Sequence, residues 1–291
     1  MNMSTGKEKS YSKSIFIHKT IRTIICIILC ILSLFPFALM IINATRDSAS
    51  ISKGLSLIIS THFMENLSNL MKKAEGVGTP LIKAMINSGC IAVPATLLCV
   101  YFSTMTAYGL HAYRFKLNHF AWSTILAIMM IPTQVSIIGF YKMILMVGLN
   151  DSYIPLVLPA IAAPTTVFFM RQYMKTALPL SIVEASRIDG SSELHTFNRI
   201  VVPLMKPAVA TQAIFVFIAN WNNLYIPSIL ISSASKYTLP MFIQVLRSEQ
   251  FRADFGVIYM GLLLTILPIL VVYLFLSKYI IAGVALGGVK E

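Results

Sequence analysis

Long apolar runs, separated by short polar segments, dominate the pattern of this 291-residue chain. A helix needs about 20 apolar residues to cross a hydrocarbon core about 30 Å thick. Backbone groups in lipid must bond within a helix or a closed barrel, and these runs are too long for strands. The pattern therefore predicts an all-α integral membrane protein with six transmembrane helices, at residues 23–43, 86–109, 119–147, 153–171, 207–231 and 256–279.

The polar segments divide the chain into regions with different expected positions. A cationic leader occupies residues 1–22. The run Ile24–Ile42 that follows is longer than the roughly 7–15 apolar residues of a signal peptide, so we expect an uncleaved first helix. The remaining regions are an external segment at 44–85, a five-helix core at 86–279 with a cytoplasmic loop at 172–206, and a cytoplasmic tail at 280–291.

Apolar residues recur at helical spacing between Leu55 and Met71, inside the external segment. This spacing predicts an amphipathic helix. Such a helix can lie on the membrane surface or under a partner, and it can equally pack on the outer surface of its own subunit. The pattern leaves these positions open.

Prolines fall inside two of the predicted membrane helices. Pro132 lies in the third run, and the fourth run contains Pro155, Pro159 and Pro164. A proline frees a carbonyl group and bends the helix axis, which suits helices that line a cavity. Prolines are also more frequent in membrane helices generally, so a purely structural role is the alternative.

Composition and charge agree with a membrane protein. Hydrophobic residues make up 57% of the chain and charged residues 12%, which is less charge than soluble domains carry. The net charge is +12, but more Lys and Arg fall in the segments assigned to the cytoplasm than outside. Topology and anionic lipid headgroups explain this excess, so no nucleic-acid partner is expected. Both termini are then cytoplasmic, in a bacterial plasma (inner) membrane.

The most polar stretch in the second half of the chain lies between Pro179 and Pro203. Ser181 and Glu184 have the spacing of a capping box, which predicts a short helix from about Ile182 to Gly190. One face of this helix would carry Ile182, Ala185, Ser186 and Asp189. That face can fit a groove on another protein, and an ordinary amphipathic connector is the alternative.

This stretch resembles the EAA loop of ABC-importer permeases. The matching residues are Glu184-Ala185-Ser186-Arg187-Ile188-Asp189-Gly190, then, after nine further residues, Ile200-Val201-Val202-Pro203. Ser186 replaces an alanine of the family pattern and Val202 replaces a leucine. Other stretches, such as Leu149-Asn150-Asp151-Ser152-Tyr153, are similar to the carbohydrate-uptake branch and to the shorter six-helix permease of its maltose-type importers.

The resemblance implies a type I ABC importer permease fold with a cytoplasmic coupling helix. It implies a binding-protein-dependent transport subunit rather than an enzyme, carrying an oligosaccharide or, alternatively, a solute such as a glycerol phosphodiester. The implied partners are a second permease in a heterodimer, two ATPase subunits, an extracellular sugar-binding protein and membrane lipid. The residues implied to contact the ATPase are Glu184, Ala185, Ser186, Asp189 and Gly190.

The resemblance places ATP and Mg on the ATPase subunits, with no cofactor bound by this chain. The sequence agrees, because it contains no GxxxxGK[ST] motif. Its five histidines are scattered, so no metal site is expected. A secondary transporter is disfavoured, because it would be expected to carry ionisable side chains deep in its helices for ion coupling. Away from the terminal residues of predicted helices two to six, the only Lys, Arg, Asp or Glu is Lys142, and it lies near one end of its helix.

Helix five carries a cluster of amides and aromatic rings near mid-membrane. Amides at that depth are costly unless they face protein or water, and they suit sugar hydroxyls while aromatic rings suit sugar C–H faces. Hydrogen bonding between helices is the competing role. The candidate residues of a translocation path are Asn220, Trp221, Asn223 and Tyr225, with Gln134 from helix three. In the resembled importers, the loop equivalent to the external stretch Ser232–Phe255 meets a sugar-binding protein, and a solvated loop is the alternative.

Overall fold

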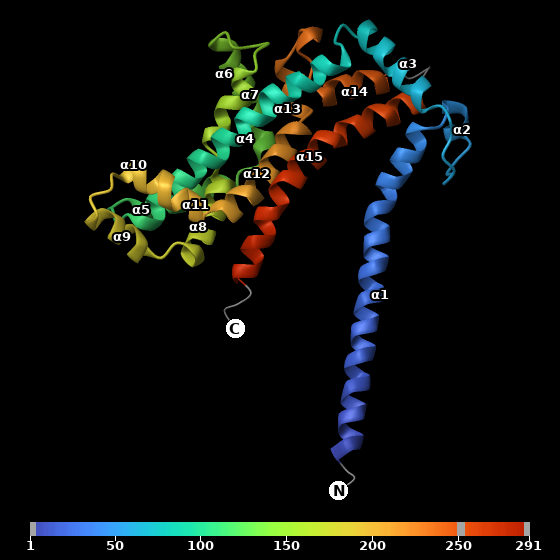
Figure 1. Ribbon diagram of the computed structural model, residues 1–291. Coiled ribbons are helices and arrows are strands. Elements are labelled where there is room, and N and C mark those ends of the chain that lie inside the picture. Colours follow the sequence, from blue (N-terminus) through green and yellow to red (C-terminus); the bar gives the residue numbers. More distant parts are fainter. Residues whose placement is uncertain (1–3, 249–253, 288–291) are drawn as a thin grey trace. The chain divides into compact units, whose positions relative to one another are not determined.

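The computed structural model describes residues 4–248 and 254–287, and within these ranges it contains helices, turns and loops but no strand (Figure 1). Five helical segments of the described residues are long and apolar enough to cross a membrane, and there are six if the bent pair formed by residues 118–129 and 134–146 is one span. The described chain forms two compact units. One comprises residues 4–70 with 254–263, and the other comprises residues 71–248 with 264–287.

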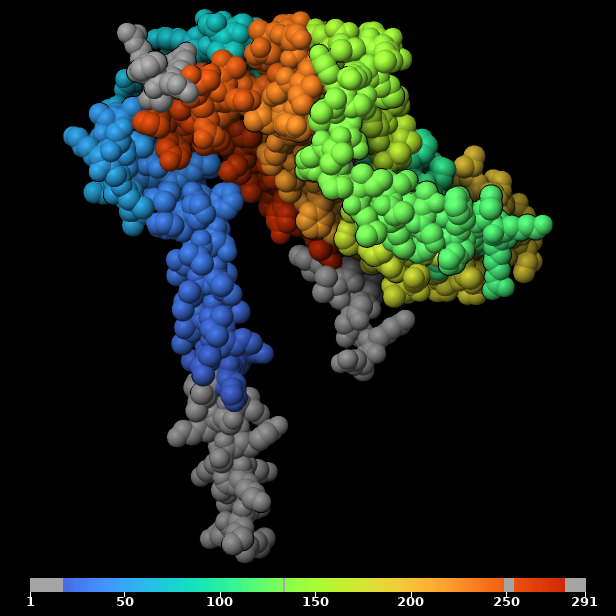
Figure 2. All heavy atoms as spheres, turned by 180° about the vertical axis from the view of Figure 1, so that it is seen from behind, coloured from blue at the N-terminus to red at the C-terminus, as the bar shows by residue number. Residues whose placement is uncertain are grey.

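The first unit is built on α1 (Ser4–Ala44), which contains the candidate span His18–Ala44. None of the most apolar window of this span is buried, and Figure 2 shows the span as a column of exposed side chains. The helix passes without a break through the predicted boundary at residue 22. The unit also contains α2 (Ser48–Ser52) and the first parts of α3 (Phe63–Gly76) and α15 (Phe255–Gly287).

The amphipathic helix predicted from Leu55 to Met71 begins only at Phe63. Hydrogen bonds at both ends hold residues 54–60 as an irregular loop. The Arg46 guanidinium donates to Gly54 O, and the Ser60 amide donates to Thr45 Oγ1 at 2.9 Å. These two ties to the end of α1 explain why the helical periodicity of residues 55–62 is not realised.

The first unit is held together where the end of α1, the Asn66 side chain of α3 and the start of α15 meet. Asn66 is buried and its Nδ2 donates to Ala44 O at 2.8 Å and to Arg46 O at 3.0 Å. Gly256 of α15 lies against this junction, because a Cβ placed there would come within 2.6 Å of both Arg46 O and Asn66 Oδ1. Only glycine therefore fits at this point of α15.

Gly256→Ala is expected to destabilise the protein, although alanine ordinarily favours helices over glycine. The added methyl group must displace backbone and a satisfied amide, a type of overpacking that costs about 1–3 kcal/mol. Thermal unfolding of the purified protein in nanodiscs measures the effect as a lower transition temperature. Gly89→Ala is the matched control, because a Cβ at this helical glycine meets nothing within 4 Å. Equal transition temperatures for the two variants would contradict the prediction.

The second unit is organised around α4 (Leu81–Ala112), which packs along α8 (Pro164–Ala177) and α12 (Lys206–Trp221) (Figure 1). Around these long helices lie α5 (Asn118–Met129), α6 (Thr133–Met146), α7 (Ile154–Val157), η1 (Leu158–Ile161), α9 (Leu180–Ile188), α10 (Glu193–Thr196), the π-helical η2 (Phe197–Val201), α11 (Val202–Leu204), α13 (Tyr225–Leu230), η3 (Ala234–Lys236) and α14 (Leu239–Ser248). The core includes Tyr108, Met170, Met174, Val183 and Phe197. It therefore extends from the membrane helices into the loop that carries α9.

Three of the predicted continuous spans are interrupted. Residues 130–132 separate α5 from α6, which meet at a bend of 100°. Residues 162–163 separate η1 from α8, and residues 222–224 separate α12 from α13. A proline lies at the end of each of the first two breaks. Pro132 is the last residue of the first break and the N-cap of α6, and Pro164 follows the second break as the first residue of α8. The prolines thus end helices here, where the sequence had suggested bends.

Candidate functional site

The short helix in the loop predicted to be cytoplasmic begins earlier than the sequence predicts. Pro179, in an extended conformation, is the N-cap of α9, and no side chain caps the helix. The predicted capping box of Ser181 and Glu184 is therefore wrong, because Ser181 already lies inside the helix. The end of the helix matches the expectation. Gly190 follows it with φ +76°, which favours glycine.

The face of α9 that points inward includes Ser186. Its side chain is buried with Val183, donates to Val183 O at 2.8 Å and lies 3.2 Å from Thr196 Oγ1. Ser186 therefore fastens α9 to α10 and does not share an outward face with Ala185 and Asp189 as expected. Four of the five predicted contact residues remain exposed: Glu184, Ala185, Asp189 and Gly190.

Two large apolar side chains project from the same loop into the surroundings. Ile188 is 86% exposed and Leu194 is 65% exposed. Apolar side chains exposed singly are common on protein surfaces, so these two gain significance only from their place in the loop that resembles the EAA loop. The sequence analysis missed both residues. The available signal was an isolated isoleucine between Arg187 and Asp189 in the polar stretch.

An ion pair and aromatic rings attach this loop to the end of α4. Arg187 Nε lies 2.9 Å from Glu193 Oε1, and the Tyr108 hydroxyl donates to Glu193 Oε2 at 3.2 Å. The Arg187 guanidinium also lies over the Tyr113 ring, 4.9 Å from its centre. Hydrogen bonding by Tyr113, reinforced by Arg187, holds the pKa of Glu193 below its usual value. Glu193 thus stays ionised, and α9 and α10 are fixed on the membrane helices.

A cavity of about 550 Å³ lies where the three interrupted helices meet. Each break contributes to its wall, through Ile131, Ala163 and Asn223. Irregular backbone at membrane depth is tolerated where it is buried in protein or lines a water-filled cavity. The cavity therefore accounts for three helix breaks at this depth. The polar side chains in the wall are Ser136, Thr166, Asn220 and Asn223, and the remaining lining residues carry no charge.

Two of the five predicted path residues line this cavity. Asn220 Nδ2 donates to Val216 O at 2.8 Å, and Asn223 Oδ1 accepts from the Ile226 amide at 3.3 Å. Each amide keeps one atom, Asn220 Oδ1 and Asn223 Nδ2, for which the described residues supply no hydrogen bond. These two atoms can bind a polar solute.

The other three predicted path residues lie elsewhere. Trp221 is 4% exposed, donates from Nε1 to Thr265 O at 3.0 Å and stacks on Phe217. Consecutive residues of a helix point about 100° apart, so Trp221 faces away from the cavity that Asn220 lines. It packs helices together instead. Tyr225 and Gln134 are exposed and do not line the cavity.

A carboxylate clamp holds the segment after α13. Asp151 Oδ1 accepts from the Ser232 and Ser233 amides at 3.0 and 2.9 Å, and Oδ2 lies 2.8 Å from Lys236 Nζ. Asp151 adopts φ +54°, a conformation that few residues other than glycine take. On the other side, Asn87 Nδ2 donates to Tyr237 O at 2.9 Å. The start of the predicted external stretch is thus rigidly attached, whereas residues 249–253 lie outside the described residues.

Asp151→Asn is expected to loosen this segment. Hydrogen bonds from Lys236 and then from Ser233 lower the pKa of Asp151, so the clamp is complete above the ordinary aspartate pKa and is lost as the pH falls toward the lowered value. Faster trypsin cleavage after Lys236 measures the loss. The control is Asp189→Asn, because the side chain of Asp189 is exposed and has no hydrogen bond or ion pair to any of the described residues. Unchanged cleavage in Asp151→Asn would rule out a clamp.

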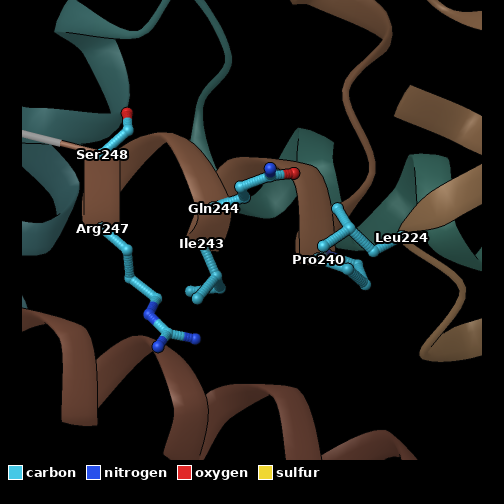
Figure 3. A pocket seen from close by; sticks show the side chains of 6 residues that line it. All are labelled: Leu224, Pro240, Ile243, Gln244, Arg247 and Ser248. Atoms are coloured by element: carbon cyan, nitrogen blue, oxygen red, sulfur yellow. The ribbon is translucent and has the colours of Figure 1, made fainter. Parts of the chain in front are cut away.

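An open hollow of about 440 Å³ lies beside α14 (Figure 3). The Arg247 side chain extends from α14 into it, and Leu224 forms another part of the wall. Met241, Phe242 and Leu246 on the same helix are buried. α14 is thus amphipathic, and it presents a cation and polar groups next to the break that carries Asn223.

Comparisons with known proteins agree with one another. The family model described as "Binding-protein-dependent transport system inner membrane component" matches residues 100–283. The arabinooligosaccharides transport system permease protein AraQ of Bacillus subtilis is 33% identical over 281 residues, which cover 96% of this chain and 99% of that protein.

Two further relatives have other solutes in their names. The lactose transport system permease protein LacG of Rhizobium radiobacter is 30% identical, covering 89% of this chain and 92% of LacG. The sn-glycerol-3-phosphate transport system permease protein UgpE of Escherichia coli K12 is 31% identical, covering 86% and 90%. The fold is similar to that of a chain in the crystal structure of a bacterial ABC transporter involved in the import of the acidic polysaccharide alginate. That match has a TM-score of 0.76 and 20% identity over 91% of this chain and 97% of the other.

Proposed function

Because this chain belongs to the family of binding-protein-dependent transport system inner membrane components, we propose that it forms half of a translocation path for an oligosaccharide or a related sugar. The chain is a permease subunit of an ABC importer and is not itself an enzyme. The observation that supports a sugar is the cavity wall, which offers uncharged amides and hydroxyls but no charged side chain. A phosphate-bearing solute is the second candidate, supported by the UgpE relative and by Arg247 at the hollow beside α14.

The proposed complex contains a second, different permease subunit, two ATPase subunits that bind ATP and Mg, and an extracellular sugar-binding protein. This chain itself would hold no cofactor. The proposed orientation in the bacterial inner membrane has both termini in the cytoplasm, so that α9 and α10 face the ATPase subunits. Support for this contact comes from the exposed Ile188 and Leu194, with Glu184 beside them as a charged partner.

The connection between α9 and the cavity suggests how ATPase motion opens the path. The 14 residues of α8 form one continuous helix about 21 Å long. This helix begins directly after Ala163 in the cavity wall, and its other end is connected through the buried Leu178 to α9. A second connection runs along α4, from Cys99 in the cavity wall to Tyr108, which holds Glu193. Displacement of α9 would therefore move two walls of the cavity together.

Purification of the tagged chain from its native membrane tests this assignment. We expect co-isolation with a second permease and ATPase subunits, and no ATP hydrolysis or transport by the chain alone. In nanodiscs, ATP hydrolysis by the complex should rise when glycan-loaded binding protein is added. A full response to amino-acid-loaded binding protein, with none to glycan-loaded protein, would contradict the sugar assignment. Transport by the chain alone would contradict the importer assignment.

A further inference from the structure

The loop between α2 and α3 presents an uncovered apolar surface. Four of its five consecutive side chains from residue 55 to residue 59 are 60–76% exposed: Leu55, Leu57, Ile58 and Ile59. Exposing such side chains to water is unfavourable by about 1.5–3 kcal/mol each relative to full burial. A contiguous apolar patch of this kind marks a contact with a membrane or a protein.

Both ends of this loop are tied to the end of α1. At one end, Arg46 Nη1 and Nη2 donate to Gly54 O, each at 3.3 Å. At the other, the Ser60 amide donates to Thr45 Oγ1 at 2.9 Å, and the His62 amide donates to Thr45 O at 3.0 Å. Thr45 and Arg46 follow directly on Ala44, the last residue of the span. The loop is therefore fixed at the level where α1 leaves the membrane.

The length of the loop limits how far its tip can lie from that level. The tip of the loop is about three residues away from the tie at Gly54 and from the tie at Ser60. Three residues reach at most about 10 Å. The headgroup layer on each side of a bilayer is about 5–8 Å thick. The apolar side chains thus lie within or next to this layer. The irregular backbone cannot enter the hydrocarbon core, where its polar groups would lose their partners.

We propose that the loop of residues 55–59 inserts into the headgroup layer at the carboxyl end of α1 and contacts phospholipid. Like the loop, α1 exposes apolar side chains, because its most apolar window has no buried residue. Lys53, at the base of the loop, is exposed and suits an anionic lipid phosphate. The loop acts as an interfacial anchor that fixes the end of α1 in the bilayer. This assignment does not depend on which solute the complex carries.

Photocrosslinking in the assembled complex, in nanodiscs of native lipid, tests the proposal. The substitution is Ile58→p-benzoylphenylalanine, which should not disturb packing because Ile58 is 76% exposed. After irradiation, mass spectrometry of the chain should find phospholipid adducts as the main product. The same substitution at Leu32 and at Leu34, which lie on opposite sides of α1, gives the reference yield for lipid contact.

The possible products separate the candidate occupants. Phospholipid adducts at Ile58, at a yield within the range of the Leu32 and Leu34 controls, support the proposal. A crosslink to the second permease or to the binding protein as the main product would overturn it. Absence of any adduct at Ile58, with lipid adducts on α1, would overturn it as well, because the loop would then lie in water.

Discussion

Ile188→Asp is expected to release the ATPase subunits while leaving the permease folded. Ile188 is 86% exposed at the end of α9, so the substitution removes no contact within the chain. In the complex, a carboxylate would replace the apolar side chain at the proposed ATPase contact and would lose its water. A loss of about 2 kcal/mol or more corresponds to at least about 30-fold weaker association. Pull-down stoichiometry and ATP-dependent uptake of the solute measure it.

The matched control is Ser192→Asp in the same loop. It adds the same charge at an exposed N-cap position whose serine makes no capping hydrogen bond, and aspartate is equally suited to an N-cap. Association should stay as in the unmodified protein. If Ile188→Asp retained full ATPase stoichiometry, the contact surface would have to lie elsewhere on the loop, and the proposed role of Ile188 would be wrong.

The sequence predicted the helical type of the membrane segments, because hydrophobic length alone determines it. The predicted number of six agrees with the described residues where the bent pair of α5 and α6 counts as one span. The expected fold class, an all-α type I ABC importer permease, is confirmed by the family match and by the fold comparison. The positions of the breaks could not be predicted in the same way. Pro132 and Pro164 end helices, whereas Pro36, Pro94 and Pro268 lie inside continuous helices. Whether a proline ends a helix depends on whether neighbouring segments accept the freed carbonyl groups, which only the packing decides.

The site was predicted in part for a similar reason. The motif spacing located α9 correctly, but it could not tell inward from outward faces, so Ser186 was placed on the partner side although it is buried. Hydropathy gave the depth of the amide cluster but not its rotation about the helix axis. Asn220 and Asn223 face the cavity, whereas Trp221 faces Phe217 and Thr265. The Asp151 clamp joins residues 81 or more positions apart, and no local pattern reveals such a contact.

Asn223→Leu is expected to lower solute transport roughly tenfold or more. Asn223 Nδ2 has no hydrogen-bond partner among the described residues, so this donor is available to the solute. The substitution also removes the bond from the Ile226 amide to Asn223 Oδ1, which at 3.3 Å is a long hydrogen bond. A solute hydroxyl left without its partner costs about 1–3 kcal/mol, and 1.4 kcal/mol corresponds to tenfold. Asn220→Leu should act in the same direction. Uptake into proteoliposomes at saturating binding protein measures both.

Asn222→Leu is the matched control, because Asn222 is exposed, next in sequence to Asn223 and outside the cavity wall. This variant should transport normally. Complex assembly and the stimulation of ATP hydrolysis by loaded binding protein should persist in all three variants, since α9 is unchanged and the coupling through α8 is intact. A parallel loss of stimulation and uptake in Asn223→Leu would indicate a role in joining helices instead of binding solute. Normal uptake in both Asn220→Leu and Asn223→Leu would show that the solute passes elsewhere.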